Sequence, residues 1–226
     1  VTVPVPSFLI DHPAGKLLFD TGMHPDARTD PCGRLGPVAE IFRPEIAADA
    51  DVAARLRLLG LEPREVPLVV LSHLHFDHAG GSALLPEATL LVQRREWEAG
   101  GDADLAAENG YDAKDYDLGH RLRLVDGEHD IFGDGSVVCL PTYGHTPGHQ
   151  SLRVRTEVGE VVLTADACYL RRNLVENRLP PIGFDREAAA ESLRSLRQLG
   201  ESGARLIYGH DPENWASVPQ APRPVL

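Results

Sequence analysis

The chain has 226 residues, 42% of them hydrophobic, and a formal net charge of −12. This size fits one domain over residues 1–226 with a substantial core, and the acidic balance disfavours a nucleic-acid partner because negative surfaces repel phosphate backbones. No apolar stretch approaches the roughly 20 residues that cross a bilayer, so we expect no membrane partner. The three cysteines lack CxxC spacing and indicate free thiols in a reducing compartment, which favours the cytoplasm.

Strand-like and helical patterns alternate along the first half of the chain. Apolar runs on both sides of a turn at 11–15 predict a hairpin. Residues 23–46 lack periodicity and are rich in Gly and Pro, so we expect a long loop of the functional or mobile kind. Apolar residues at helical spacing predict a helix over 45–60. Short apolar runs at 66–72 and 88–93 predict buried strands, and the second is followed by the start of a helix.

The second half of the chain is dominated by strand-like runs. Four of them follow a mixed polar stretch and occupy residues 120–125, 136–140, 150–156 and 160–166. Asp185 is a suitable N-cap for a helix that we expect to end just before Gly200. A last strand is predicted within 204–211. Helices that separate groups of strands favour an α/β fold in which two sheets pack together with the helices outside.

The segment SHLHFDHAGG at 72–81 is typical of a metal site. His73 and His75 point the same way in an extended segment and can share one ion. Asp77 and His78 follow where the chain turns, in position to serve a second ion. A histidine-rich surface loop without a ligand is an improbable alternative for this motif. A structural zinc site is disfavoured too, since such sites are usually closed by four cysteine-rich ligands.

Three further metal-ligand candidates each follow a strand-like run, and strand ends along one sheet edge can reach a common cleft. The predicted ligands form two sets that share Asp166, namely His73, His75 and His145 for one ion and Asp77, His78 and His210 for the other. Seven nitrogen and oxygen ligands with one bridging carboxylate suit two divalent ions. The nitrogen-rich ligation favours two zinc ions, with iron, cobalt and manganese as alternatives.

These motifs resemble the metallo-β-lactamase superfamily over nearly the whole chain. The resemblance rests on FDTG at 19–22, HxHxDH at 73–78, the His145 turn, Asp166 and His210. Within the superfamily, LSHLHFDHAGG, PTYGHTPGHQSL, VLTADACYL, GFD and YGHD are similar to segments of N-acyl homoserine lactonases. The resemblance implies an αββα sandwich, in which two mixed β-sheets are flanked by helices and a dinuclear site lies on one edge.

The resemblance also implies a function, the opening of the lactone ring of N-acyl homoserine lactones (quorum quenching). A hydroxide bridging the two ions is expected to attack the lactone carbonyl, while the Tyr169 hydroxyl stabilises the oxyanion. Asp77 is expected to carry the proton to the leaving oxygen. Expected substrate contacts, besides Tyr169, are Phe76, Gly183 and Phe42. The partner is thus a small acyl lactone, and a homodimer is one option for the assembly.

True β-lactamases fit less well, because they place cysteine or serine where this chain has Asp166. Two other functions stay open. A thioesterase of the glyoxalase II kind would share the ligands, but that family typically adds a C-terminal helical region with basic residues, whereas sixteen residues without a basic cluster follow His210. A non-hydrolytic di-iron redox protein is the lesser alternative. Around the site we expect Asp20 to brace the ligands and His149 to support the His145 turn.

Overall fold

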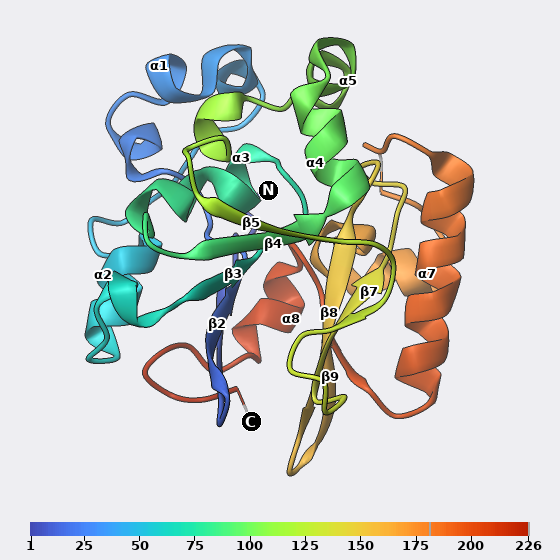
Figure 1. Ribbon diagram of the computed structural model, residues 1–226. Helices are drawn as coiled ribbons and strands as arrows, with labels where there is room; N and C mark the ends of the chain where they lie inside the picture. Colours follow the sequence, from blue (N-terminus) through green and yellow to red (C-terminus); the bar gives the residue numbers. More distant parts are fainter. Residues whose placement is uncertain (181, 226) are drawn as a thin grey trace.

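The computed structural model describes residues 1–180 and 182–225, whose strands form two five-stranded sheets (Figure 1). The first sheet contains, in spatial order, β1 (Phe8–His12), β2 (Gly15–Phe19), β3 (Leu68–Val70), β4 (Thr89–Gln93) and β5 (Arg121–Val125). The second contains β10 (Arg205–Ile207), β9 (Gly159–Leu163), β8 (Gln150–Thr156), β7 (Val137–Pro141) and β6 (His129–Asp130). Both sheets are mixed, because β2 to β5 run parallel, as do β9 and β10, while the other neighbours are antiparallel.

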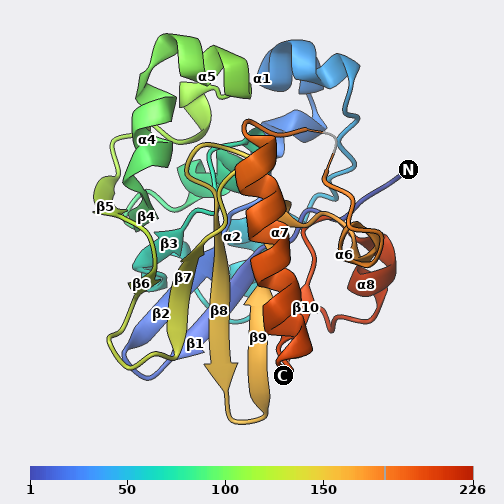
Figure 2. The ribbon, with the colours of Figure 1, turned by 90° about the vertical axis from the view of Figure 1, so that its right-hand side faces the viewer.

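Helices cover the outer faces of the two sheets, whereas the short helix Pro212–Ala216 packs through Trp215 against the cluster between them. The α-helices of the described residues are α1 (Pro31–Leu35), α2 (Val52–Leu58), α3 (Phe76–Ala79), α4 (Arg94–Gly101), α5 (Ala103–Asn109), α6 (Arg171–Val175), α7 (Arg186–Glu201) and α8 (Pro212–Ala216). Short 3-10 helices lie at Pro25–Arg28, Gly36–Glu40, Pro63–Glu65, Gly80–Leu84, Ala113–Asp115 and Ala165–Ala167. Figure 2 shows α7, the longest of them, lying across the outer face of the second sheet.

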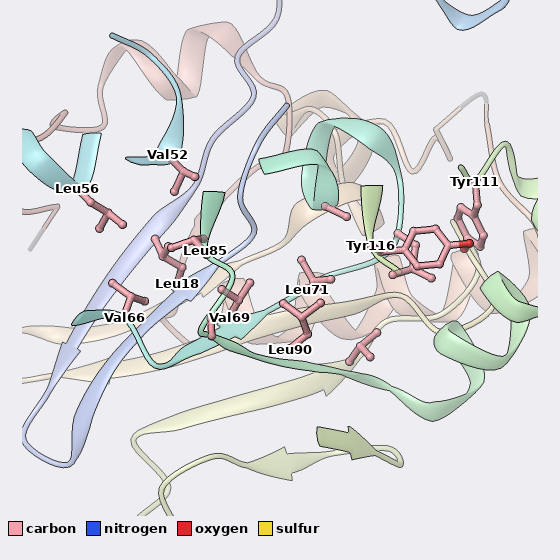
Figure 3. Packing of buried hydrophobic residues seen from close by; sticks show 14 of the residues in the cluster. Leu18, Val52, Leu56, Val66, Val69, Leu71, Leu85, Leu90, Tyr111 and Tyr116 are labelled. Carbon is pink, nitrogen blue, oxygen red and sulfur yellow. The ribbon is translucent and has the colours of Figure 1, made fainter. Parts of the chain in front are cut away.

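Three apolar clusters fill the spaces between these layers. The cluster between the sheets takes Phe19 and Leu91 from one sheet and Leu152 from the other. A second cluster lies on the outer face of the first sheet and includes Leu90 of β4 and Leu56 of α2 (Figure 3). The third cluster joins the outer face of the second sheet to buried leucines of α7. Helix, sheet, sheet and helix layers therefore follow one another, and the predicted αββα sandwich is confirmed.

The predicted strands and the hairpin β1–β2 are confirmed, but several boundaries differ from the prediction. The helix expected over 45–60 begins only at Val52, because the carboxylate of Asp51 accepts a hydrogen bond from the amide of Ala54 at 2.9 Å and caps the helix there. The expected loop at 23–46 contains α1 and two 3-10 helices, and α5 was not predicted at all. Helix α7 continues through Gly200 to Glu201.

The cysteines agree with a further expectation. Cys139 and Cys168 are buried, Cys32 is exposed, and all three are free thiols. Of the helices within 1–180 and 182–225, none combines the length and the apolar character that a bilayer span needs. The compartment in which the protein works stays a prediction.

Candidate metal centre

The carboxyl ends of neighbouring parallel strands bring the candidate ligands together. Strands β2, β3 and β4 are parallel neighbours, so their ends meet at one edge of the first sheet. Asp20 follows β2, and the segment from His73 to His78 follows β3. In the second sheet β9 and β10 are parallel, and they are followed by Asp166 and His210. The predicted candidates thus lie at adjoining edges of the two sheets.

The first predicted ligand set forms a compact group. His73, His75, His145 and Asp166 each offer one ligand atom, and these atoms all lie within 4.8 Å of one another. The Nδ1 atom of His75 is 2.9 Å from Nε2 of His73 and 3.1 Å from Nε2 of His145. The latter atom lies 3.3 Å from Oδ2 of Asp166. Ligands bound tetrahedrally at about 2.0–2.1 Å lie about 3.3–3.4 Å apart, so the donor atoms have the spacing that a zinc-sized ion requires.

The second predicted ligand set lies on the other side of Asp166. Oδ1 of this residue is 3.2 Å from Nε2 of His78 and 3.0 Å from Nε2 of His210. Asp77 completes the group, with its Oδ2 atom 3.7 Å from each of these two nitrogens. The two oxygens of Asp166 therefore face different histidine sets. This is the arrangement expected of a carboxylate that bridges two ions.

Hydrogen bonds on the far side of three imidazoles orient their free lone pairs toward the cluster. Each of these rings has one nitrogen that faces a fixed acceptor. Nε2 of His75 lies 2.7 Å from the carbonyl oxygen of Asn109, and Nδ1 of His78 lies 2.8 Å from the carboxylate of Asp20. Nδ1 of His210 lies 2.8 Å from the carbonyl oxygen of Pro4. A carbonyl or carboxylate oxygen only accepts, so these nitrogens donate and the opposite nitrogen of each neutral ring carries a lone pair. Metal-binding histidines are usually held in this way.

Two buried atoms of the cluster lack a hydrogen-bond partner among the described residues. They are Nε2 of His78 and Oδ1 of Asp166, which face each other at 3.2 Å. Two electron pairs at this distance repel each other unless a positive charge, either a proton or a metal ion, lies between or beside them. The donor set therefore fits a cation, and its composition of imidazoles and carboxylates suits divalent transition metals.

The pKa values of the histidines differ between the two predicted ligand sets. Burial alone would lower the pKa of His210, but the Asp166 carboxylate outweighs it and raises the pKa to about 9. For His78 burial is likewise outweighed by the neighbouring carboxylates, and its pKa is raised. Burial lowers the pKa values of His73 and His145, so these rings are neutral and ready to act as ligands. The second set in particular attracts positive charge.

Asp20 braces the cluster as predicted. Its Oδ1 atom accepts a hydrogen bond from the amide of Ser72 at 2.7 Å, and its Oδ2 atom accepts one from the Ser72 hydroxyl and one from His78, both at 2.8 Å. Asp20 adopts a φ of 60°, in the left-handed region that non-glycine residues avoid. Such backbone strain is maintained where surrounding contacts fix a functional geometry.

His149 supports the cluster without being available as a ligand. Its Nδ1 atom faces the carbonyl of Thr142 at 3.0 Å, and its Nε2 atom accepts a hydrogen bond from the amide of Asp166 at 3.0 Å. Both ring nitrogens are therefore engaged. The predicted support of the His145 turn is present through Thr142, and the contact with Asp166 additionally fixes the bridging carboxylate.

The two predicted catalytic side chains lie beside the histidines. The Tyr169 hydroxyl is 3.4 Å from Nδ1 of His145, and its ring centroid lies 5.2 Å from that of His210. Tyr169 thus borders the cluster and does not simply pack under a helix. Asp77 lies in the first turn of α3 and is partly exposed. Both residues line one wide groove of about 1310 Å³, which also reaches His75.

The predicted substrate contacts occupy two different places. Phe42 and Phe76 line the same groove as the catalytic side chains, and their ring centroids are 6.0 Å apart. Gly183 instead lines a small neighbouring cavity that also reaches His145 and Asp166. The prediction missed Glu96, a fully buried carboxylate at the start of α4 that accepts hydrogen bonds from both histidine-bearing loops. Its only sequence signal is a charged residue just after a strand.

Comparisons with known proteins agree with this geometry. The family model of the metallo-beta-lactamase superfamily matches residues 1–210. The N-acyl homoserine lactonase AttM of Azorhizobium caulinodans is 40% identical over 227 aligned residues, which cover 97% of this chain and 86% of that protein. The N-acyl homoserine lactonase AiiA of Bacillus thuringiensis subsp. kurstaki is 34% identical over 217 aligned residues, which cover 94% of this chain and 83% of that protein.

A solved structure extends the similarity to three dimensions. It is an N-acyl homoserine lactone hydrolase with the product N-hexanoyl-L-homoserine bound at its catalytic metal centre. It matches 98% of this chain, and 86% of its own chain is covered, with a TM-score of 0.86 and 32% sequence identity. The chain therefore belongs to the metallo-beta-lactamase superfamily and, within it, to the family of N-acyl homoserine lactonases.

Proposed function

We propose that this protein is a dinuclear metal hydrolase that opens the lactone ring of N-acyl homoserine lactones. The observation that carries the proposal is the opening of the Asp166 cluster into a wide groove, with Tyr169 and Asp77 beside the cluster and aromatic rings on the groove wall. A ring carbonyl can thus approach the cluster while an acyl chain extends along the groove. The relatives named above act on, or hold the product of, this class of substrate.

Zinc is the metal that the donor set fits best. His73, His75 and His145 would hold one ion, Asp77, His78 and His210 the other, and Asp166 would contact both. When bound, two such ions supply a nucleophile by lowering the pKa of water, and they polarise the substrate carbonyl. The preference for zinc over iron, cobalt or manganese rests on the imidazole-rich ligation.

Tyr169 is proposed to stabilise the charge that develops on the carbonyl oxygen. Burial raises the pKa of its hydroxyl, and the nearby carboxylates of Asp166 and Asp77 raise it further. The hydroxyl therefore stays protonated at neutral pH and can donate a hydrogen bond to the oxyanion. The donor is held beside His145, at the mouth of the cluster.

Asp77 is proposed to move the proton. Its carboxylate lies between the cluster and the groove, so it can contact both the attacking and the leaving oxygen. Phe42 and Phe76 are proposed to contact the acyl chain, since both rings border the groove. Gly183 is proposed to approach the substrate amide from the side of the small cavity that reaches His145.

The function is tested by a substrate panel. Purified, zinc-loaded protein is assayed with a pH indicator on short- and long-chain acyl homoserine lactones, on γ-butyrolactone and on an acyl-glutathione thioester. We expect acid release with a kcat/KM of at least about 10⁴ M⁻¹s⁻¹ on the acylated lactones. γ-Butyrolactone should react more slowly, because it lacks the acyl chain. Hydrolysis of the thioester alone would transfer the function to a thioesterase of the glyoxalase II kind.

The role of Tyr169 is tested by Tyr169→Phe, which removes only the hydroxyl. We expect kcat on the best acyl lactone to fall on the order of 10²-fold, as for loss of one oxyanion donor. Zinc content, measured by atomic spectroscopy, should match that of the parent, since the tyrosine is not among the proposed ligands. Unchanged kcat and KM would exclude this role.

The role of Asp77 is tested by Asp77→Asn, which keeps the size of the side chain and removes its basicity. We expect kcat to fall by about 10²- to 10⁴-fold, the contribution of a general acid–base group. Because Asp77 is also a proposed ligand, zinc content is measured on the same sample. A variant that retains both ions and turns over at nearly the parent rate would contradict proton transfer by Asp77.

A further inference from the structure

Glu96 is a fully buried carboxylate on which the two histidine-bearing loops converge. It lies in the first turn of α4 and is 0% exposed. Its Oε1 atom accepts hydrogen bonds from the amide of Leu74 at 3.1 Å and the hydroxyl of Tyr111 at 2.6 Å. Its Oε2 atom accepts from the hydroxyl of Thr146 at 2.9 Å and the amide of Gly148 at 2.7 Å. All four donors thus point at one side chain.

Three of these donors belong to the segments that carry the first ligand set, and the fourth packs against a ring of that set. Leu74 stands between His73 and His75 in the loop after β3. Thr146 and Gly148 belong to the turn that begins at His145, after β7. Tyr111 packs against His75, with ring centroids 5.4 Å apart. One carboxylate therefore sets the separation between two loops that have no close connection along the chain.

Only a carboxylate can serve all four donors. Each oxygen receives one backbone N–H group, from Leu74 on one side and from Gly148 on the other. An amide nitrogen does not accept a hydrogen bond, so a glutamine would leave one of these buried N–H groups without its acceptor in either orientation. Packing at this point is also close, because a Cβ atom on Gly148 would lie 2.5 Å from the backbone nitrogen of Glu96.

The charge of Glu96 has no cationic side chain to balance it. The ion pairs of the described residues include none with Glu96. The groups that surround it are neutral donors and, beyond them, the imidazoles of the first set. A cation held by these imidazoles would compensate this charge, and the attraction acts in a medium of low dielectric constant.

We propose that Glu96 is a positioning residue for the first metal, one that fixes His73 and His75 relative to His145 through four hydrogen bonds and favours the cation there by its buried charge. This inference rests on the proposed metal site. It predicts that Glu96 acts on metal affinity through the first ligand set and leaves the set formed by Asp77, His78 and His210 largely unaffected.

The test is Glu96→Gln, with Glu98→Gln as the matched control. Glu98 lies on the same helix and is exposed, so the control makes the same chemical change away from the site. Zinc affinity of each metal-free protein is measured by titration against a chelating competitor. We expect one of the two zinc affinities of Glu96→Gln to fall by about 10- to 100-fold, as for other residues that orient metal ligands. Glu98→Gln should match the parent.

A second pair of variants identifies the affected set. In a His145→Ala background the first set is already incomplete, so Glu96→Gln should cause little further loss of affinity. Parent-like affinity of Glu96→Gln for both ions, or a loss that adds fully to that of His145→Ala, would overturn the inference.

Thr146→Ala replaces this test if Glu96→Gln does not fold, because it removes one donor and keeps the carboxylate. We then expect a smaller loss of zinc affinity at the same ion. Parent-like zinc affinity of Thr146→Ala would overturn the inference.

The zinc-affinity test of Glu96 and the activity test of the proposed function can fail independently of each other. Normal lactone hydrolysis by the parent together with unchanged zinc affinity in Glu96→Gln would reject only the positioning role. Weakened zinc binding in Glu96→Gln, combined with a parent that does not hydrolyse acyl lactones, would reject only the substrate assignment.

Discussion

The site depends above all on the carboxylate of Asp166. This residue is 3% exposed, and its two oxygens face different groups of imidazole nitrogens at 3.0 to 3.8 Å. A carboxylate buried this deeply is tolerated only beside positive charge. Asp166 raises the pKa values of His78 and His210, so protons on these rings, or a metal ion in their place, would stabilise this carboxylate. The rest of the fold can be understood as the scaffold that holds this carboxylate between its neighbours.

The two sheets meet this requirement because parallel strands end together. The loops after β2 and β3 supply Asp20 and the HxHxDH segment, and α4, which directly follows β4, supplies Glu96. The segments after β9 and β10 supply Asp166 and His210. Backbone strain gathers at the same edge, since Asp20 and Ala165 both adopt positive φ angles of 60° and 44°. The apolar clusters between and outside the sheets provide the rigidity that maintains this geometry.

The cluster of candidate ligands was predictable from the sequence, as were the supporting residues Asp20 and His149, whereas Glu96 was not. The spacing of His73 and His75, and the position of Asp166 and His210 after apolar runs, express strand periodicity that local sequence carries. Glu96 has no such pattern, because its role arises from donors that lie 15 to 52 residues away along the chain. The late start of α2 depends likewise on one capping contact of Asp51, which apolar periodicity does not report.

The dinuclear centre is tested most directly by anomalous diffraction from crystals of the zinc-loaded protein, recorded on both sides of the zinc absorption edge. We expect two anomalous peaks about 3.5–4 Å apart. One should lie among His73, His75 and His145 and the other among Asp77, His78 and His210, with Asp166 in contact with both. A single peak, or a pair whose ligands do not include Asp166, would contradict the dinuclear centre from which the proposed function is argued.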